Sequence, residues 1–406
     1  MSRVNNICSA NIFFLSYYYV LILLVGLLIV WKALPVDLAR IFIGTFIVFG
    51  FLYQPTAYRW IKWDGRFFAL LVFAVYAMVT GWWHHSFQPV MYAMGILIVY
   101  MLLLLYVSPC SQLQINNLFK KLGYITLFYF ILNMLACILY KEQLIGTSTS
   151  HFYKGLLRNP NSSADVLYVG MIFTFLALFS SKKTREIILF CISLFLGFFF
   201  LLFTSSRSAC FAAIFLFAGV FLFSFVLRFF KHEGKQTNFQ IMWISLLAFF
   251  FVLGLLFLVG YGLHKGHYIA YFLSANLDGR QAVWQCAFHV LNSQPAYQLV
   301  GVGLGDNEWI FKSCGLAYTK AHNSMLDVLL ATGYIGLAIF LVFIMSCLYF
   351  LIKRAIKKQD MFSIFLLLAT VSLILHSFVE SYLLNQLSPD LFCFFLLQCV
   401  AIEFVG

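Results

Sequence analysis

The chain has 406 residues, of which 63% are hydrophobic and only 10% are charged, and its formal net charge is +12. Soluble globular domains carry about 25% charged residues, so this composition excludes a single water-soluble core. The hydrophobic residues come in repeated blocks of roughly 17–25, the length that crosses a bilayer as an α-helix. The sequence therefore predicts an all-α, polytopic membrane protein.

We predict about twelve transmembrane helices from these blocks. They lie near residues 11–31, 37–53, 66–83, 89–108, 121–140, 164–181, 187–203, 209–229, 240–261, 326–350, 362–379 and 389–405. The first block lacks the small-residue cleavage site of a removed signal peptide, so we expect it to be retained. The expected organisation is one membrane domain, with nine spans in residues 1–261, a larger loop with short helices in 262–325, and three spans in 326–406.

The basic residues are distributed unevenly between the two sides of this arrangement. If the N-terminus lies inside, short inside segments hold more than half of the 26 lysines and arginines. Cytoplasmic loops carry such an excess, so we expect both termini in the cytoplasm and the loops 141–163 and 262–325 on the outer side of the membrane. The net charge is therefore interpreted as a topology signal, and no nucleic-acid partner is expected.

The ten cysteines are scattered, and the sequence has no CxxC motif and no Cys/His spacing typical of a metal site. We expect neither a metal nor a cofactor. Cys286 and Cys314 share the large outside loop, in a compartment that permits disulfides. A bridge between them and two free thiols are both open alternatives.

Charged side chains are nearly absent from the predicted spans and gather at their outer ends. Examples are Asp165, Arg207, His322, and His376 with Glu380. Ion-coupled transporters usually carry ionisable residues near the membrane midplane. The pattern favours chemistry at the outer surface, and a transporter or flippase stays the alternative from another class.

Two predicted outer turns contain an arginine. Arg207 lies in FTSSRSACF, between the seventh and eighth spans, and Arg158 precedes the turn at Asn159 and Pro160. A guanidinium makes bidentate contacts with phosphate oxygens, so Arg207 is a candidate phosphate ligand. The alternative is an interfacial arginine that reaches lipid head groups.

The large loop contains one predicted amphipathic helix, in LDGRQAVWQCAFHVLNSQP. Its roughly helical apolar pattern is formed by Ala282, Trp284 or Cys286, Phe288, Val290 and Leu291. Arg280 falls in the first turn, where the helix dipole disfavours a cation, and this suggests an anionic partner. The alternative is a surface helix that rests on the bilayer.

The glycine-rich segment LVGVGLGDNEW follows in the same loop. It lacks the GK[ST] ending of a phosphate-binding loop, so we interpret it as a turn that lets the loop fold back.

His322 and Asn323 stand directly before the tenth span. Asn323 or Ser324 is a candidate helix cap, with His322 only an interfacial polar residue. In the sharper hypothesis, neutral His322 accepts a proton from a sugar hydroxyl, which suits a side chain that titrates near neutral pH. His376 and Glu380 end the eleventh span at i, i+4 spacing, which predicts one shared helix face.

The segment AHNSMLDVLLATGYIGL resembles the His-Asn…Leu…Gly-x-x-Gly-Leu signature of the bacterial O-antigen ligase and O-antigen polymerase family. The matching residues are His322, Asn323, Leu326, Gly333, Gly336 and Leu337. The segments RNPNSSADVL, SSRSA and DGRQAVWQ…VGVGLG also resemble segments of the family, in the same order. The combination of order, spacing and outside location carries the resemblance.

The resemblance implies a metal-independent, inverting glycosyltransferase with a multi-span, GT-C-like fold, active on the periplasmic face of the bacterial inner membrane. The implied donor is a glycan linked to undecaprenyl pyrophosphate. A polymerase transfers it to the next lipid-linked repeat unit, and a ligase transfers it to a sugar of the lipid A core. The sequence that follows Ser324 is more similar to polymerases, so polymerase is the first expectation and ligase the alternative.

The resemblance also implies roles for individual residues. Arg207 and Arg280 would hold the donor pyrophosphate, and His322 would activate the acceptor hydroxyl. Asn323, Glu380 and Arg158 are supporting candidates. We expect His322, Arg207 and Arg280 to line one outer cavity, with membrane lipids and a chain-length regulator as further partners.

Overall fold

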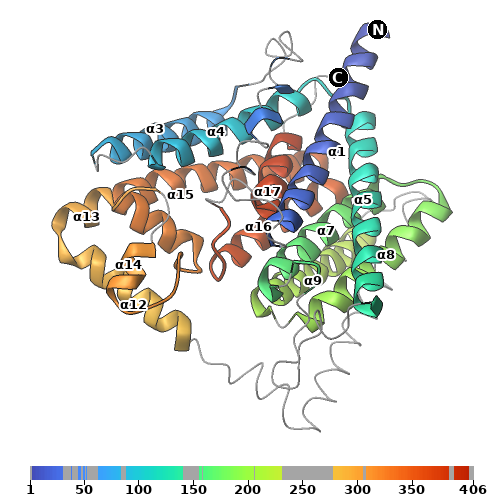
Figure 1. Ribbon diagram of the computed structural model, residues 1–406. Helices are drawn as coiled ribbons and strands as arrows, with labels where there is room; N and C mark the ends of the chain where they lie inside the picture. The colour runs from blue at the N-terminus through green and yellow to red at the C-terminus, as the bar shows by residue number, and fades with distance from the viewer. Residues whose placement is uncertain are drawn as a thin grey trace. The chain divides into compact units, whose positions relative to one another are not determined.

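The computed structural model describes residues 2–30, 63–83, 88–139, 155–157, 159–204, 206–230, 278–304, 308–383 and 388–401, with isolated positions between 38 and 52. All regular elements within these residues are helices (Figure 1). They are α1 (Ser2–Val30), α3 (Gly65–Trp83), α4 (Gln88–Val107), α5 (Gln112–Leu139), α7 (Pro160–Ser180), α8 (Thr184–Phe203), α9 (Arg207–Phe230), α12 (Asp278–Ser293), α13 (Pro295–Val300), α14 (Glu308–Ser313), α15 (Ser324–Lys358), α16 (Met361–Ser377) and α17 (Pro389–Val400).

The described helices agree with the prediction of a polytopic membrane protein. Seven of them are long and apolar enough to cross a bilayer, and three shorter apolar helices cover Gly65–Gly81, Met361–Ser377 and Pro389–Val400. These ten correspond to ten of the predicted spans. The span predicted at 37–53 lies largely outside the described residues, and the span at 240–261 lies wholly outside them.

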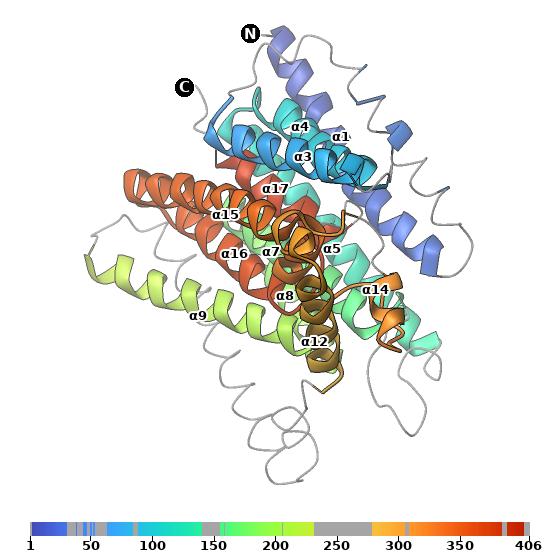
Figure 2. The same cartoon turned by 90° about the vertical axis from the view of Figure 1, so that its left-hand side faces the viewer.

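The chain divides into two compact units, each built from separated segments. Unit 1 contains Met1–Leu118, Leu277–Arg354 and Leu373–Gly406, and unit 2 contains Phe119–Asn276 and Ala355–Ser372. In unit 1, α3 and α4 lie side by side (Figure 2). Helix α12 contacts both α13 and α14. The predicted outer residues Arg280, His322 and Glu380 all belong to unit 1.

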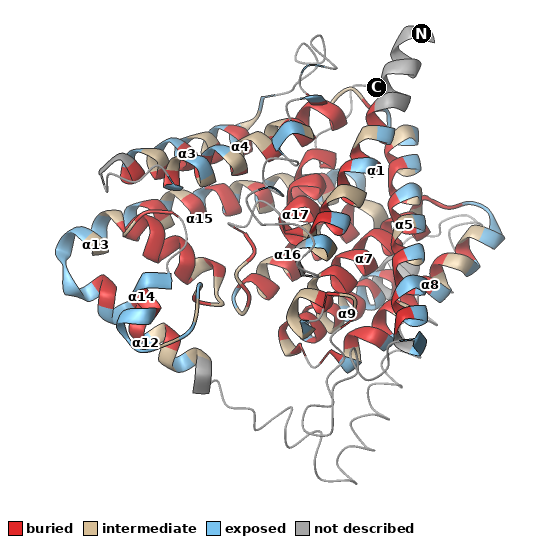
Figure 3. Ribbon diagram, viewed as in Figure 1, coloured by how far each residue is buried: buried red, intermediate tan, exposed pale blue. Residues whose placement is uncertain are grey.

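Helix α17 forms the centre of unit 1. Every residue from Asp390 to Val400 is buried, as the red ribbon in Figure 3 shows. The Phe392 ring centre lies 5.7 Å from that of Tyr19 on α1, and the Phe395 ring centre lies 5.0 Å from that of Tyr100 on α4. A helix that is apolar on all sides is stable only when other elements surround it.

Two buried arginines bind the C-terminal carbonyls of α17. Arg66 Nη1 donates to Gln398 O at 2.6 Å, and Arg354 Nη1 donates to Val400 O at 2.7 Å. Arg66 Nε also donates to Asp64 at 2.9 Å. Cations are favourable at this end of a helix because the terminal carbonyls carry partial negative charge. Two of the predicted inside cations therefore also have a local structural role.

Unit 2 is centred on α7, which contacts α8 and α9. Asn159 caps its N-terminus, because the side-chain oxygen accepts the N–H groups of Asn161 and Ser162. Such a cap stabilises a helix by about 1 kcal/mol. Pro160 takes the first helical position, where its missing N–H costs nothing. The predicted turn at Asn159–Pro160 is thus the start of α7.

Helix α15 is interrupted at Gly333, whose backbone has φ 64° and ψ −171°. The interruption frees carbonyls of the preceding turn, and each then needs a new partner inside the membrane protein. Leu330 O accepts Val302 N–H at 2.8 Å, Ala331 O accepts Gly303 N–H at 2.9 Å, and Thr332 O accepts the Tyr76 hydroxyl at 3.3 Å. The nine residues Ser324–Thr332 therefore form a short helical segment held from the side by the glycine-rich loop.

Glycine is required on both sides of this contact. A Cβ atom on Gly333 would lie 2.3 Å from the Leu299 backbone, and one on Gly301 would lie 2.4 Å from the backbone of Ala331. Both residues also have positive φ, which non-glycine residues rarely adopt. The glycine-rich segment is thus a turn that packs backbone against backbone on α15, in agreement with the predicted turn.

Candidate active site at the outer ends of α15 and α16

Helix α12 is the predicted amphipathic helix and places Arg280 in its first turn. Its buried residues follow the i, i+3, i+4, i+7, i+8 pattern of one helix face. They are Val283, Cys286, Ala287, Val290 and Leu291. Phe288, which the sequence analysis included in the apolar pattern, is 46% exposed. Its position is one residue out of phase with that face.

The buried face of α12 packs against α14 and against the first segment of α15, where Leu326, Leu329 and Leu330 complete one core cluster. A disulfide joins Cys286 on α12 to Cys314 after α14, with Cα atoms 6.2 Å apart. Of the two alternatives open for these cysteines, the structure has the bridge. It ties the helix that carries Arg280 to the segment that leads to His322.

The His322 segment is held at several points. Trp284 Nε1 donates to Ala321 O at 2.9 Å, and Ala321 N–H donates to the Asp327 carboxylate at 2.8 Å. His322 itself has φ 52°, an unusual conformation for a residue other than glycine. Strain of this kind costs about 1–3 kcal/mol and persists only where the surroundings enforce it. The position of His322 is therefore strongly determined.

Asn323 caps α15, as one of the open alternatives predicted. Its side-chain oxygen accepts the N–H groups of Met325 at 3.0 Å and Leu326 at 3.1 Å. Ser324 has a different role, since its hydroxyl donates to Glu380 O at 2.8 Å and accepts Tyr382 N–H at 3.1 Å. The cap and the histidine hypothesis are compatible, because capping uses Asn323 and leaves the His322 ring free to make other contacts.

Glu380 lies in the turn after α16, which ends at Ser377. The prediction that His376 and Glu380 share one helix face was wrong, because the helix stops between them. The two side chains serve different partners. Glu380 contacts His322 and Arg280, whereas His376 faces Asp390.

The carboxylate of Glu380 joins the two predicted functional residues. Its Oε1 accepts a hydrogen bond from Arg280 Nη2 at 2.7 Å, and its Oε2 lies 3.3 Å from His322 Nδ1. Arg280 Nη1 also donates to Val379 O at 2.6 Å. The Glu380 side chain is 8% exposed, against 33% for His322 and 26% for Arg280. The carboxylate is thus the buried part of the site, and the histidine and the arginine are its accessible parts.

The electrostatics of this contact keep Glu380 ionised. Burial raises the pKa of its carboxyl group, but the hydrogen bond to His322 and the charge of Arg280 lower it by more, so the pKa lies below its ordinary value. An ionised carboxylate only accepts hydrogen bonds, which assigns the proton of a neutral His322 ring to Nδ1. The lone pair is then on Nε2, where a general base needs it.

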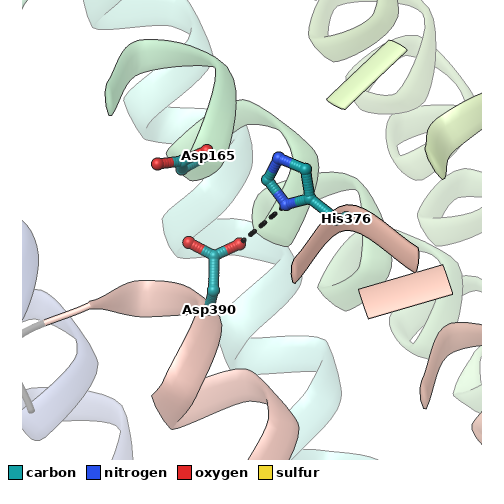
Figure 4. Close-up of side chains that lie close together, drawn as sticks. All are labelled: Asp165, His376 and Asp390. Carbon is teal, nitrogen blue, oxygen red and sulfur yellow. Dashed lines mark ion pairs between the residues drawn. The ribbon is translucent and has the colours of Figure 1, made fainter. Parts of the chain in front are cut away.

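His376 and Asp390 form a buried polar pair (Figure 4). His376 Nδ1 lies 3.8 Å from Asp390 Oδ1, and both side chains are fully buried. The Ser388 hydroxyl donates to Asp390 Oδ2 at 3.1 Å, and Asp390 N–H donates back to that hydroxyl at 3.1 Å. The His376 ring also packs against Tyr382, 5.3 Å between ring centres. Nothing in the sequence predicted the pairing of His376 with Asp390, since it joins two helices separated by a loop.

Arg207 and Arg158 are the remaining predicted site residues. Arg207 begins α9 in unit 2, after the short connection from Phe203 that the sequence predicts. Arg280 and His322 belong to unit 1. That Arg207 lines one cavity with them stays a prediction. Arg158 lies outside the described residues.

The fold and the site together define a polytopic helical membrane protein with a histidine, a glutamate and an arginine joined at helix ends. Residues 192–341 match the family model described as O-antigen ligase. Over this segment the chain is similar to the O-antigen ligase family, whose members are ligase- or polymerase-type membrane enzymes of lipid-linked polysaccharide synthesis. The match confirms the resemblance and contains Arg207, Arg280 and His322, whereas Glu380 lies beyond it. No curated protein matches the sequence.

Proposed function

We propose that this protein is a glycosyltransferase that transfers a glycan from undecaprenyl pyrophosphate to an acceptor hydroxyl at the periplasmic face of the inner membrane. Polymerisation of a surface polysaccharide is the first candidate reaction. The observation that carries the proposal is the Glu380 carboxylate, which contacts His322 with one oxygen and Arg280 with the other. Glu380 thus holds a proposed general base, His322, and a proposed anion ligand, Arg280, close together. This arrangement suits a reaction with an anionic leaving group.

In this proposal His322 is the general base. The acceptor oxygen attacks the anomeric carbon of the donor, its proton passes to Nε2 of His322, and the bond from the anomeric carbon to the pyrophosphate oxygen breaks. Attack from the face opposite the leaving group inverts the configuration. Glu380 holds the imidazole in the required tautomer and stabilises the imidazolium that forms, in the manner of the carboxylate in a Ser-His-Asp triad.

Arg280 is the proposed ligand of the departing pyrophosphate. Its two bonds to Glu380 and Val379 use two of five N–H donors, so three donors are left for phosphate oxygens. A preorganised cation stabilises the negative charge that develops on the leaving group. Arg207 is proposed as the second cation, and a pyrophosphate that leaves as an anion needs no proton from an acid.

The proposed side of the membrane is supported by two features. Disulfides persist in oxidising compartments such as the periplasm, and the Cys286–Cys314 bridge lies in the same loop as the site. The basic pair Arg66 and Arg354, which the charge distribution assigns to the cytoplasm, binds the C-terminal end of α17. Arg354 lies near the end of α15 opposite His322, as a spanning α15 requires.

The first test uses point variants in the producing bacterium. We expect His322→Ala and Arg280→Ala to abolish long glycan chains on a lipopolysaccharide gel while the protein stays in the membrane. His289→Ala and Lys312→Ala are matched controls, because both residues are exposed in the same loop. Normal ladders in the His322 and Arg280 variants, at wild-type protein levels, would refute the proposal.

A second test separates the two candidate reactions. The ligase is the second candidate because the matching family model carries that description. Deletion of a polymerase leaves core with a single repeat unit. Deletion of a ligase leaves bare core, while polymer accumulates on the lipid carrier. The gel pattern of the deletion strain therefore decides between them.

A further inference from the structure

Tyr318 stands four residues before His322 in the same non-helical segment. Its ring centre lies 5.7 Å from that of His322, and the two ring planes are inclined by 87°. The ring also packs against the core cluster formed by α12, α14 and the first segment of α15. The core thus holds a half-buried tyrosine directly beside the accessible imidazole.

The Tyr318 side chain is only partly buried. In an edge-to-face pair the two rings do not stack, so the histidine covers at most one face of the phenol ring. Among the residues that the structure describes, none forms a hydrogen bond with the Tyr318 hydroxyl. The side chain therefore offers an apolar surface and a polar tip next to the proposed base.

We propose that Tyr318 is a binding residue for the acceptor sugar, and this rests on the proposed function of the site. A sugar ring combines apolar C–H faces with hydroxyl groups, and an anchored phenol ring matches both parts. The donor pyrophosphate belongs at Arg280, on the other side of the shared carboxylate of Glu380. The group next to His322 must be the one that loses its proton, which is the acceptor.

The test measures the two substrates separately. The protein is reconstituted in lipid nanodiscs with donor lipid extracted from the deletion strain. The acceptor probes are lipid A-core from that strain and a short-chain pyrophosphate-linked repeat unit. We expect Tyr318→Leu to raise the acceptor KM about three- to tenfold, the range for loss of one aromatic contact. The donor KM and the slow cleavage of donor without acceptor should stay unchanged.

Two comparisons make this result specific. Tyr297→Leu removes a half-buried tyrosine that packs against the same core cluster, and it should leave the acceptor KM unchanged. Tyr318→Phe keeps the ring and should retain most of the acceptor affinity. An acceptor KM in Tyr318→Leu equal to that of Tyr297→Leu would overturn the proposal. So would a fall in kcat at unchanged acceptor KM, which would assign Tyr318 to the positioning of His322.

Failure of the proposed function gives a different result. If wild-type protein transfers glycan to neither acceptor, or if His322→Ala keeps full activity, the glycosyltransferase proposal fails and the role of Tyr318 fails with it. If wild type is active, His322→Ala is inactive and Tyr318→Leu behaves as wild type, only the role of Tyr318 is refuted.

Discussion

Among single residues, Glu380 has the largest influence on the geometry of the candidate site. It is buried and ionised, and it bonds the two accessible residues of the candidate site. A carboxylate so placed determines which ring nitrogen of His322 is basic and how Arg280 is oriented. The family match ends before Glu380, so its importance follows from the tertiary contacts alone.

We therefore predict that Glu380→Gln lowers kcat by about 10²–10⁴-fold, because a wrong tautomer of His322 forfeits the usual contribution of a positioned general base. The amide removes the negative charge and can present N–H to Nδ1, which would favour the unproductive tautomer. Glu380→Asp keeps the charge and should recover part of the activity. Initial rates with extracted donor lipid measure both, and equal rates for the Gln and Asp variants would contradict a role of the charge.

The lowered pKa of Glu380 predicts the pH dependence of its contribution to stability. A carboxylate whose pKa is depressed in the folded protein stabilises the fold at pH values above its unfolded pKa, and this contribution is lost as the pH falls through the folded pKa. Melting temperatures of wild type and Glu380→Gln in detergent should therefore differ at neutral pH and converge in acid. A difference that grows toward low pH would contradict this sign.

Among the helices, α15 has the feature on which the site depends most. Its interruption at Gly333 separates a short segment, with His322 and its cap Asn323 at the N-terminal end, from the long helix that follows. The glycine-rich loop binds the carbonyls freed by the interruption. The loop therefore contributes to the position of His322 although it contains none of the proposed catalytic residues.

We predict that Gly301→Ala and Gly333→Ala abolish activity and lower the melting temperature. Each added methyl group meets backbone atoms at 2.3–2.4 Å, which no side-chain movement can relieve. Gly315→Ala is the matched control, because Gly315 also has positive φ but a Cβ there meets no atom within 4 Å. It should cost only the backbone strain of about 1–2 kcal/mol. Equal losses in all three variants would contradict a specific role of the contact.

The predicted membrane topology places the inside basic residues and the candidate site on opposite sides of the bilayer. Basic residues that the sequence assigns to the inside, Arg66 and Arg354, bind the C-terminal end of α17, and the candidate site lies at the other end of α15. We predict that Thr319→Cys reacts with a membrane-impermeant maleimide in intact cells, whereas Lys353→Cys reacts only after permeabilisation. Both positions are exposed. Labelling of both from outside would contradict the topology.

The sequence alone was sufficient for features that depend on composition and on short-range pattern. Hydrophobic block length determines membrane spans, so ten predicted spans reappear as helices, and helical periodicity located α12 around Arg280. The family motif singled out His322 and Arg280 because its residues are close together in the chain.

The residues that contact His322 and Arg280 became known from the folded structure and not from the sequence. Glu380 is 58 residues from His322 and 100 from Arg280, and its carboxylate contacts both from the turn that follows the end of α16 at Ser377. Local pattern cannot predict such a meeting, because it results from the packing of helices that are distant in sequence.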